Sequence, residues 1–175
     1  MKRKKTGLVL GTLVGLFILI QIIPVNFTNP PVQAEQDFLV VNQASDEVAQ
    51  KLKQSCYDCH SNETKYPWYS KVAPVSWLLK EHIDDGRRHL NFSTWDTYDL
   101  KKKDHKLEEI SEALEEGWMP MDQYLWMHKE AELSAAERQE LSNWMKQLRT
   151  ALSAPTENSA NAIQAPVTEA EATPN

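Results

Sequence analysis

The chain contains little cysteine: among its 175 residues, only Cys56 and Cys59 carry a thiol. Without a third or fourth thiol, the sequence excludes a framework of several disulfides and a four-cysteine zinc site. It also lacks a stripe of basic residues, and its formal net charge is −6, so we expect no nucleic-acid partner. Strand-like alternation and internal repeats are absent as well, and helical periodicity predominates, which predicts an all-α protein.

Long apolar runs are missing except at the start of the chain. Residues 2–5 are four cations, and residues 6–25 are almost entirely apolar, the layout of a signal peptide or a signal anchor. The positive-inside rule then keeps the cations in the cytoplasm and exports everything after residue 34. Val32-Gln33-Ala34 offers a cleavage site, but it lies far beyond the apolar run. We therefore favour a retained helix in the inner membrane, with the rest of the chain on its periplasmic or extracytoplasmic side.

Three glycines lie four positions apart in this apolar segment: Gly7, Gly11 and Gly15. Small residues at that spacing let two membrane helices approach closely. The pattern allows a weak dimer through the N-terminal helix. The alternative interpretation is that glycine is simply common in such helices.

The sequence divides into three parts. Residues 1–34 form the signal segment and a linker, residues 35–152 form one small domain, and residues 153–175 are predicted to be a disordered tail, since they are poor in apolar residues and lack aromatic ones. In the domain we expect a bundle of about four helices. Their predicted boundary signals are a cap at Ser45, a start near Pro74, a helix over residues 104–116 ended by Gly117, and a capping box of Ser134 and Glu137.

The most informative motif is Cys56-Tyr57-Asp58-Cys59-His60, which matches C-x-x-C-H, the attachment site of a c-type haem. Two thiols at this spacing reach the two vinyl groups of one porphyrin and form thioethers. The next residue then lies beneath the ring, where its imidazole can bind the iron. The stripe of Val48, Leu52 and Cys56 places the motif at the end of a helix.

Three other interpretations compete for the cysteine pair: a structural disulfide, a thioredoxin-like redox pair, or half of a zinc site completed by His82 or His89. A redox pair would be expected in a βαβ setting, and none is visible nearby. His60 directly after the second cysteine favours haem, and the export signal agrees, because bacteria attach haem c on the exported side. The predicted cofactor is one haem c, held covalently by Cys56 and Cys59 with His60 as an iron ligand.

The second axial ligand is sought later in the chain. Met119 is favoured, because it follows a predicted helix end and Pro120 stiffens its loop. A thioether ligand raises the reduction potential of the iron. Met121 is an alternative, His82 or His128 would give a bis-histidine site, and an open position is also compatible with the sequence. Arg87 or Arg88 is a candidate partner for a haem propionate, or simply part of an exposed basic turn.

These residues together resemble a known family. The run from Cys56 to Thr64, the segment Tyr66-Pro67-Trp68-Tyr69 and the later Met119-Pro120 are similar to those of the bacterial haem-binding domain family of small c-type cytochromes. Further shared residues are Pro74-Val75-Ser76-Trp77, Gly86, Arg87, Leu90, Asn91, Phe92, Ser93, Trp95, Tyr124, His128, Ala131, Leu133-Ser134 and Trp144. The resemblance implies an exported helical domain wrapped around one haem, with His60 as the proximal and Met119 as the distal ligand.

The expected function is that of a monohaem cytochrome that carries single electrons and is not an enzyme. Its partners would be redox proteins. A haem-based sensor or a peroxidase-like enzyme with an open or displaceable distal site is the alternative. A colourless redox or zinc module is a third hypothesis.

Overall fold

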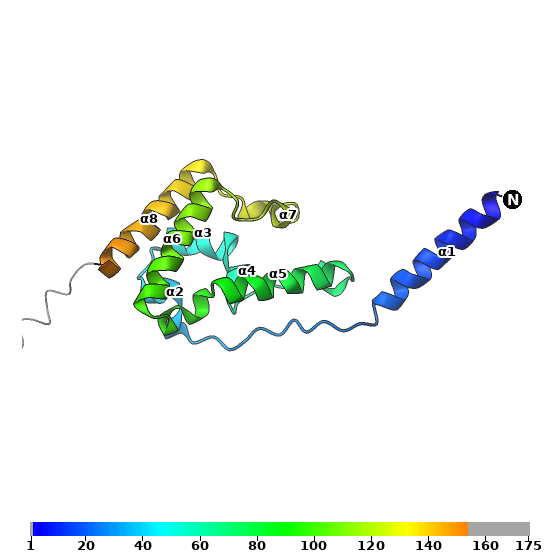
Figure 1. Ribbon diagram of the computed structural model, residues 1–175, viewed down its shortest axis with the longest axis horizontal. Coiled ribbons are helices and arrows are strands. Elements are labelled where there is room, and N and C mark those ends of the chain that lie inside the picture. Colours follow the sequence, from blue (N-terminus) through cyan, green and yellow to red (C-terminus); the bar gives the residue numbers. More distant parts are fainter. Residues whose placement is uncertain (1, 154–175) are drawn as a thin grey trace, which may run out of the picture.

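The computed structural model describes residues 2–153, and within them it contains helices and no strand, as predicted (Figure 1). The predicted tail lies outside the described residues, apart from Ser153. The α-helices are α1 (Lys2–Ile20), α2 (Phe38–Val41), α3 (Asp46–Ser55), α4 (Tyr57–His60), α5 (Val75–His89), α6 (Leu100–Glu116), α7 (Asp122–Leu125) and α8 (Ala135–Ser153). Short 3-10 segments are η1 (Ala34–Gln36), η2 (Trp68–Lys71), η3 (Phe92–Thr97) and η4 (Lys129–Ala131).

The four helices expected in the domain are α3, α5, α6 and α8, and all their boundary signals except the start of α6 are confirmed. The Ser45 side chain accepts the Val48 N–H over 3.3 Å at the start of α3. Ser134 and Glu137 form the capping box before α8, with the Glu137 carboxylate 2.9 Å from the Ser134 nitrogen. Gly117 ends α6 with φ +73°, a left-handed conformation that glycine adopts without steric cost.

One predicted boundary was wrong. Helix α6 begins at Leu100, one turn before the expected start at Asp104, because the Asp99 side chain caps it by accepting the Lys102 N–H over 2.7 Å. The one-turn helices α2, α4 and α7 were not predicted. Four residues are too few to show a helical period.

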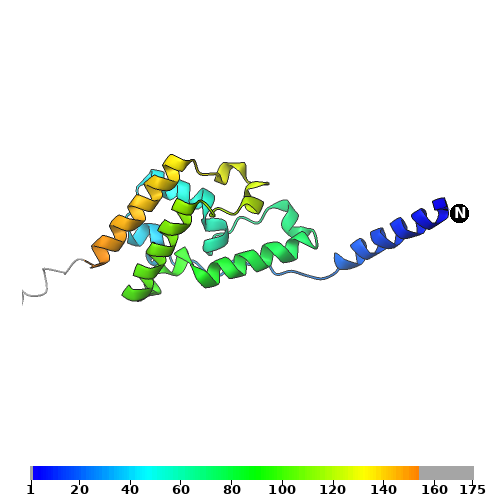
Figure 2. The same ribbon diagram turned by 45° about the horizontal axis from the view of Figure 1, so that its top comes forward.

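The hydrophobic core lies where α6 and α8 run side by side, which is clear in both Figures 1 and 2. Leu107 of α6 and Leu141 and Met145 of α8 are fully buried there. Phe38 and Trp95 join them with an edge-on ring contact at 4.8 Å. Tyr57 of α4 packs into this core and stacks on Phe92 with ring centroids 5.1 Å apart, and α5 in turn contacts α4.

Helix α1 lies apart from the domain and is joined to it by an extended linker (Figure 1). None of the helices within residues 2–153 is both long enough and apolar enough to cross a membrane, so the expected membrane helix is not confirmed. Gly7, Gly11 and Gly15 have open space around them. Dimerisation through these glycines stays a prediction.

Candidate functional site

A cavity of about 640 Å³ lies beside the core, within the 300–1,000 Å³ range of small-molecule and cofactor sites. Helices α4, α5 and α6 and the segment after α6 line it. We call residues 118–128 the distal loop. The lining residues are Ser55, Cys56, Cys59, His60, His82, Asp85, Gly86, His89, Leu90, Phe92, Lys106, Glu109, Ile110, Glu112, Ala113, Leu114, Trp118, Met119, Pro120, Met121 and Tyr124. Residues predicted from the motif and from the Met-Pro segment therefore meet at one cavity.

The motif forms the junction of α3 and α4. Cys56 ends α3 and precedes α4, and its carbonyl oxygen accepts the N–H groups of Cys59 and His60 over 3.2 and 2.9 Å. Both thiols are free. Burial raises the pKa of Cys56 to about 12 and that of Cys59 to about 11. Catalytic redox thiols have lowered pKa values, so this environment does not favour a thioredoxin-like pair.

The imidazole of His60 is oriented by backbone carbonyls of α5. Its Nδ1 lies 3.0 Å from the Gly86 oxygen and 3.3 Å from the Leu90 oxygen. Since both partners are acceptors, Nδ1 carries the proton and Nε2 keeps a free lone pair, as a metal-binding histidine requires. Burial also lowers the pKa of His60, which keeps the ring neutral.

Gly86 allows α5 to lie directly against the motif. A Cβ at this position would be 2.6 Å from the carbonyl oxygen of Cys59 and 3.1 Å from its carbonyl carbon. Backbone atoms cannot rotate out of the way as a flexible side chain can. The missing side chain thus permits the close approach that brings the Gly86 carbonyl to His60.

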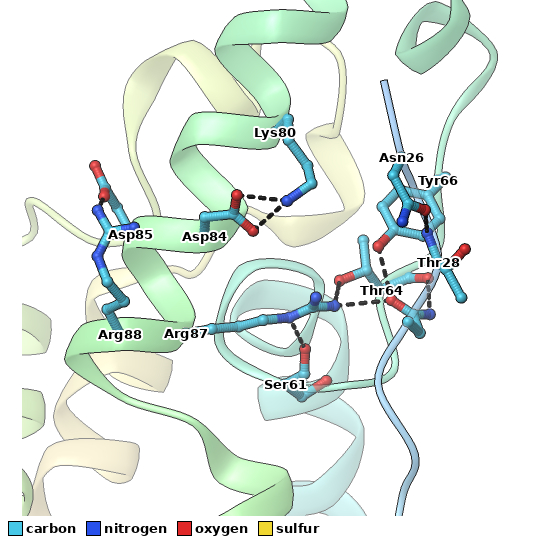
Figure 3. A network of polar contacts seen from close by, with 11 residues as sticks. Asn26, Thr28, Ser61, Thr64, Tyr66, Lys80, Asp84, Asp85, Arg87 and Arg88 are labelled. Atoms are coloured by element: carbon cyan, nitrogen blue, oxygen red, sulfur yellow. Dashed lines mark hydrogen bonds and ion pairs between the residues drawn. The ribbon is translucent and has the colours of Figure 1, made fainter. Parts of the chain in front are cut away.

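The loop after the motif is held by Arg87, as Figure 3 shows. Its guanidinium donates to the Ser61 carbonyl over 2.7 Å and to the Thr64 hydroxyl over 2.8 Å. It also donates to Asn29 of the linker over 2.8 Å. Arg88 forms an ion pair with Asp85. Neither arginine lines the cavity, so the suggested role in binding a propionate is not supported. Besides His60, the cationic or titratable nitrogens that do line it belong to His82, His89 and Lys106.

The two candidate methionines enter the cavity from the distal loop. Met119 follows the end of α6 by three residues, and Met121 directly precedes α7. His82 also lines the cavity, from α5. His128 does not: its Nε2 lies 2.6 Å from the Tyr69 hydroxyl and its Nδ1 3.0 Å from a Glu130 oxygen. Of the suggested distal ligands, His128 is thus the one whose two ring nitrogens are both engaged elsewhere.

Two residues of this site went unnoticed as site residues in the sequence. Gly86 belongs to the segment that resembles the haem-binding family, but only the backbone contact with Cys59 reveals its role. Tyr124 lines the cavity and donates a hydrogen bond to Asp58 inside the motif over 2.8 Å. A separation of 66 residues between these two gives no sequence signal.

The residues present fit a haem. The cavity has a suitable size and offers two thiols, an oriented neutral imidazole, two thioether sulfurs on another segment, and nitrogens for the propionates. Together with the helical fold, these features define a haem-binding protein. A family model described as "Haem-binding domain" matches residues 15–147, and the chain belongs to this family. No curated protein and no solved structure matches it.

Proposed function

We propose that this protein is a monohaem cytochrome c that carries single electrons on the exported side of the bacterial membrane. The observation that supports it is the meeting of Cys56, Cys59, His60 and Met119 at one cavity. When bound, the haem supplies the one-electron couple of its iron. We assign the thioether bonds to the two cysteines and the axial positions to His60 and Met119.

The polypeptide has three tasks in this function. The carbonyls of Gly86 and Leu90 fix the ring of His60 and raise its basicity. Leu90, Phe92 and Leu114 line the cavity with apolar surface, which excludes water and thereby shifts the potential. A thioether ligand favours the reduced state. With both axial positions filled, no substrate binds the iron, so we expect a carrier and not an enzyme.

Optical spectra of the full chain, exported in a host that attaches haem c, test this proposal. We expect a low-spin c-type spectrum with a Met–iron charge-transfer band. The band should vanish in Met119→Ala and persist in Met121→Ala. Met127→Ala is the matched control, because Met127 lies in the same loop but is 56% exposed and does not line the cavity.

Each other outcome has a defined meaning. Loss of the band only in Met121→Ala would mean that Met121, and not Met119, is the ligand. A protein with a high-spin spectrum that binds carbon monoxide without displacing a ligand would be a sensor or an enzyme, and not an electron carrier. A colourless product, from a host that makes other c-type cytochromes, would overturn haem attachment itself.

The proposed location rests on the basic and apolar N-terminal segment as an export signal. Alkaline phosphatase is active only after export, so its fusion to the C-terminus should be active. Replacing residues 2–5 and the first half of the apolar segment by polar residues should abolish that activity. Activity that survives this change would contradict the assignment.

A further inference from the structure

Two hydrogen bonds join the distal loop to the segment around and after the haem motif. The Tyr124 hydroxyl donates to Oδ2 of Asp58 over 2.8 Å. The hydroxyl of Tyr69 and Nε2 of His128 are 2.6 Å apart. Asp58 lies between the two motif cysteines, while Tyr124 shares the cavity wall with Met119 and Met121. The Tyr124–Asp58 bond thus connects the attachment motif to the loop that carries the candidate distal ligands.

The acceptor of this bond is held in place. The other carboxylate oxygen of Asp58 accepts the backbone N–H of Lys65 over 2.9 Å, and its carbonyl accepts the Thr64 hydroxyl over 2.6 Å. A loop bound to this carboxylate is therefore bound to a fixed point on the α4 side of the cavity.

The donor is equally well defined. The Tyr124 ring stacks on His128 with centroids 4.3 Å apart and planes 11° from parallel. Burial, followed by the charge of Asp58, raises the pKa of Tyr124. The phenol therefore keeps its proton at neutral pH and acts as a donor to an ionised acceptor, the stronger class of hydrogen bond.

Tyr124 is also connected directly to the backbone of Met121. Its backbone N–H donates to the Met121 carbonyl over 3.0 Å, and the Leu125 N–H donates to the same oxygen over 3.2 Å. Met121 is thus the N-cap residue directly before α7, and Met119 lies two residues before Met121. Movement of the Tyr124 side chain away from Asp58 would carry this turn, and the methionines with it.

We propose that Tyr124 is a positioning residue: through its hydrogen bond to Asp58 it holds the distal loop over the cavity and sets how readily the distal methionine leaves the iron. The proposal rests on the proposed function, because it requires a methionine ligand. Tyr124 would not itself be a ligand of the haem, but it would control access to the distal position.

The test is titration of the oxidised full-length holoprotein with imidazole, which must displace the methionine. We compare the wild type, Tyr124→Phe and Tyr66→Phe. The last is a matched control, since its hydroxyl donates to Asn29 over 2.8 Å, outside the cavity lining. Losing a hydrogen bond to a charged acceptor should raise the population of the open loop, so Tyr124→Phe should bind imidazole about tenfold more tightly. Tyr66→Phe should stay within about twofold of the wild type.

Asp58→Asn and the double variant separate positioning from general destabilisation. If the two residues act through their mutual bond, Asp58→Asn should also raise imidazole affinity, and the double variant should not exceed the larger single effect. The unfolding midpoint in urea is measured in parallel. Equal losses of stability in Tyr124→Phe and Tyr66→Phe with a change in imidazole affinity only in the former would support positioning.

If the wild type shows the Met–iron band and Tyr124→Phe binds imidazole with unchanged affinity, the positioning role of Tyr124 is overturned. The proposed function would then stand. Additive effects of the two substitutions would also overturn the positioning role. Absence of the Met–iron band from the wild type would overturn the proposed function and this inference with it.

Discussion

At the scale of single residues, Gly86 is where α5 and α4 leave no room for a side chain. Gly86→Ala would place a Cβ 2.6 Å from the Cys59 carbonyl oxygen, so α5 must move away from α4. Overpacking of this kind costs about 1–3 kcal/mol of the free energy of unfolding. The shift should also weaken the contact between the Gly86 carbonyl and His60 and change the reduction potential. Urea unfolding and potentiometry of the holoprotein measure both effects.

Gly15→Ala is the matched control for this substitution, because within the described residues a Cβ at that position would meet no atom within 4 Å outside its own stretch of helix backbone. It should leave both the unfolding midpoint and the potential unchanged. A Gly86→Ala protein with the stability and potential of the wild type would show that α5 and α4 are not in close contact.

Residue-level expectations are most specific where one local chemical pattern contains the whole argument. The spacing of Cys56, Cys59 and His60 predicts one shared site, and all three residues do line one cavity. The contacts of Arg87 and His128 could not be predicted, because their partners are distant in the sequence. Arg87 binds Ser61 and Asn29, and His128 pairs with Tyr69. Composition and periodicity contain no information on such pairs.

At the scale of elements, the linker between α1 and α2 is bound to the domain and does not simply cross its surface. Gln21 exchanges two hydrogen bonds with the backbone of Ala73, over 2.9 and 3.0 Å. Asn29 donates to the Thr64 carbonyl over 2.9 Å and accepts from Tyr66 and Arg87. The family match begins at residue 15, so it includes this linker.

We predict that Asn29→Ala lowers the free energy of unfolding by about 1–3 kcal/mol, because it removes three partly buried hydrogen bonds, each with a net contribution near 1 kcal/mol. Asn26→Ala is the control, since Asn26 is exposed and its side chain accepts only from the nearby Thr28 nitrogen. Denaturant titrations of both holoproteins give the comparison. Equal, small effects at the two asparagines would mean that the linker does not stabilise the domain.

Helices α6 and α8 are joined by an ionic contact that predicts a dependence on pH. Arg149 donates to Asp104 over 2.7 Å and to Glu108 over 2.6 Å. The hydrogen bond from Arg149 lowers the pKa of Asp104 below its usual value. Because the folded state has the lower pKa, this stabilisation is present above the unfolded pKa and is lost as the pH falls through the folded pKa.

Accordingly, the difference in stability between the wild type and Arg149→Met should be constant above about pH 5 and shrink as the pH falls from about 5 to about 2. Arg138→Met is the matched control on the same helix, because Arg138 donates to a carbonyl, that of Leu133, over 2.8 Å. Its difference from the wild type should not vary with pH. A constant difference for Arg149→Met would show that the pairing with Asp104 is not formed in solution.

Element boundaries were predictable to the extent that caps define them. Ser45, Gly117 and the Ser134–Glu137 pair act through neighbours in the sequence, and each ends or begins a helix as expected. The start of α6 was missed because Asp99 caps a turn of polar residues, where no apolar period marks the helix. The linker contacts were missed because Gln21 and Asn29 bind through side-chain amides to partners that are distant in the sequence. A polar residue in the sequence does not reveal such a partner.

At the scale of the whole molecule, the cavity and the hydrophobic core share residues. Leu90, Phe92 and Leu114 belong to both. A haem bound in the cavity would remove their remaining apolar surface from water, which contributes about 25 cal/mol per Å². We therefore expect the cofactor to stabilise the fold.

We predict that the chain made without attached haem loses its structure unevenly. Residues of α4, α5 and the distal loop line the cavity, so without the cofactor the amide hydrogens of these segments should exchange fast. Helices α6 and α8 should keep part of their protection, because Leu107, Leu141 and Met145 pack against each other without the cofactor. Hydrogen exchange of the wild-type chain from hosts with and without haem attachment measures this difference, and Cys56→Ala/Cys59→Ala in the first host serves as control. Uniform protection in both forms would mean that the haem is not part of the core.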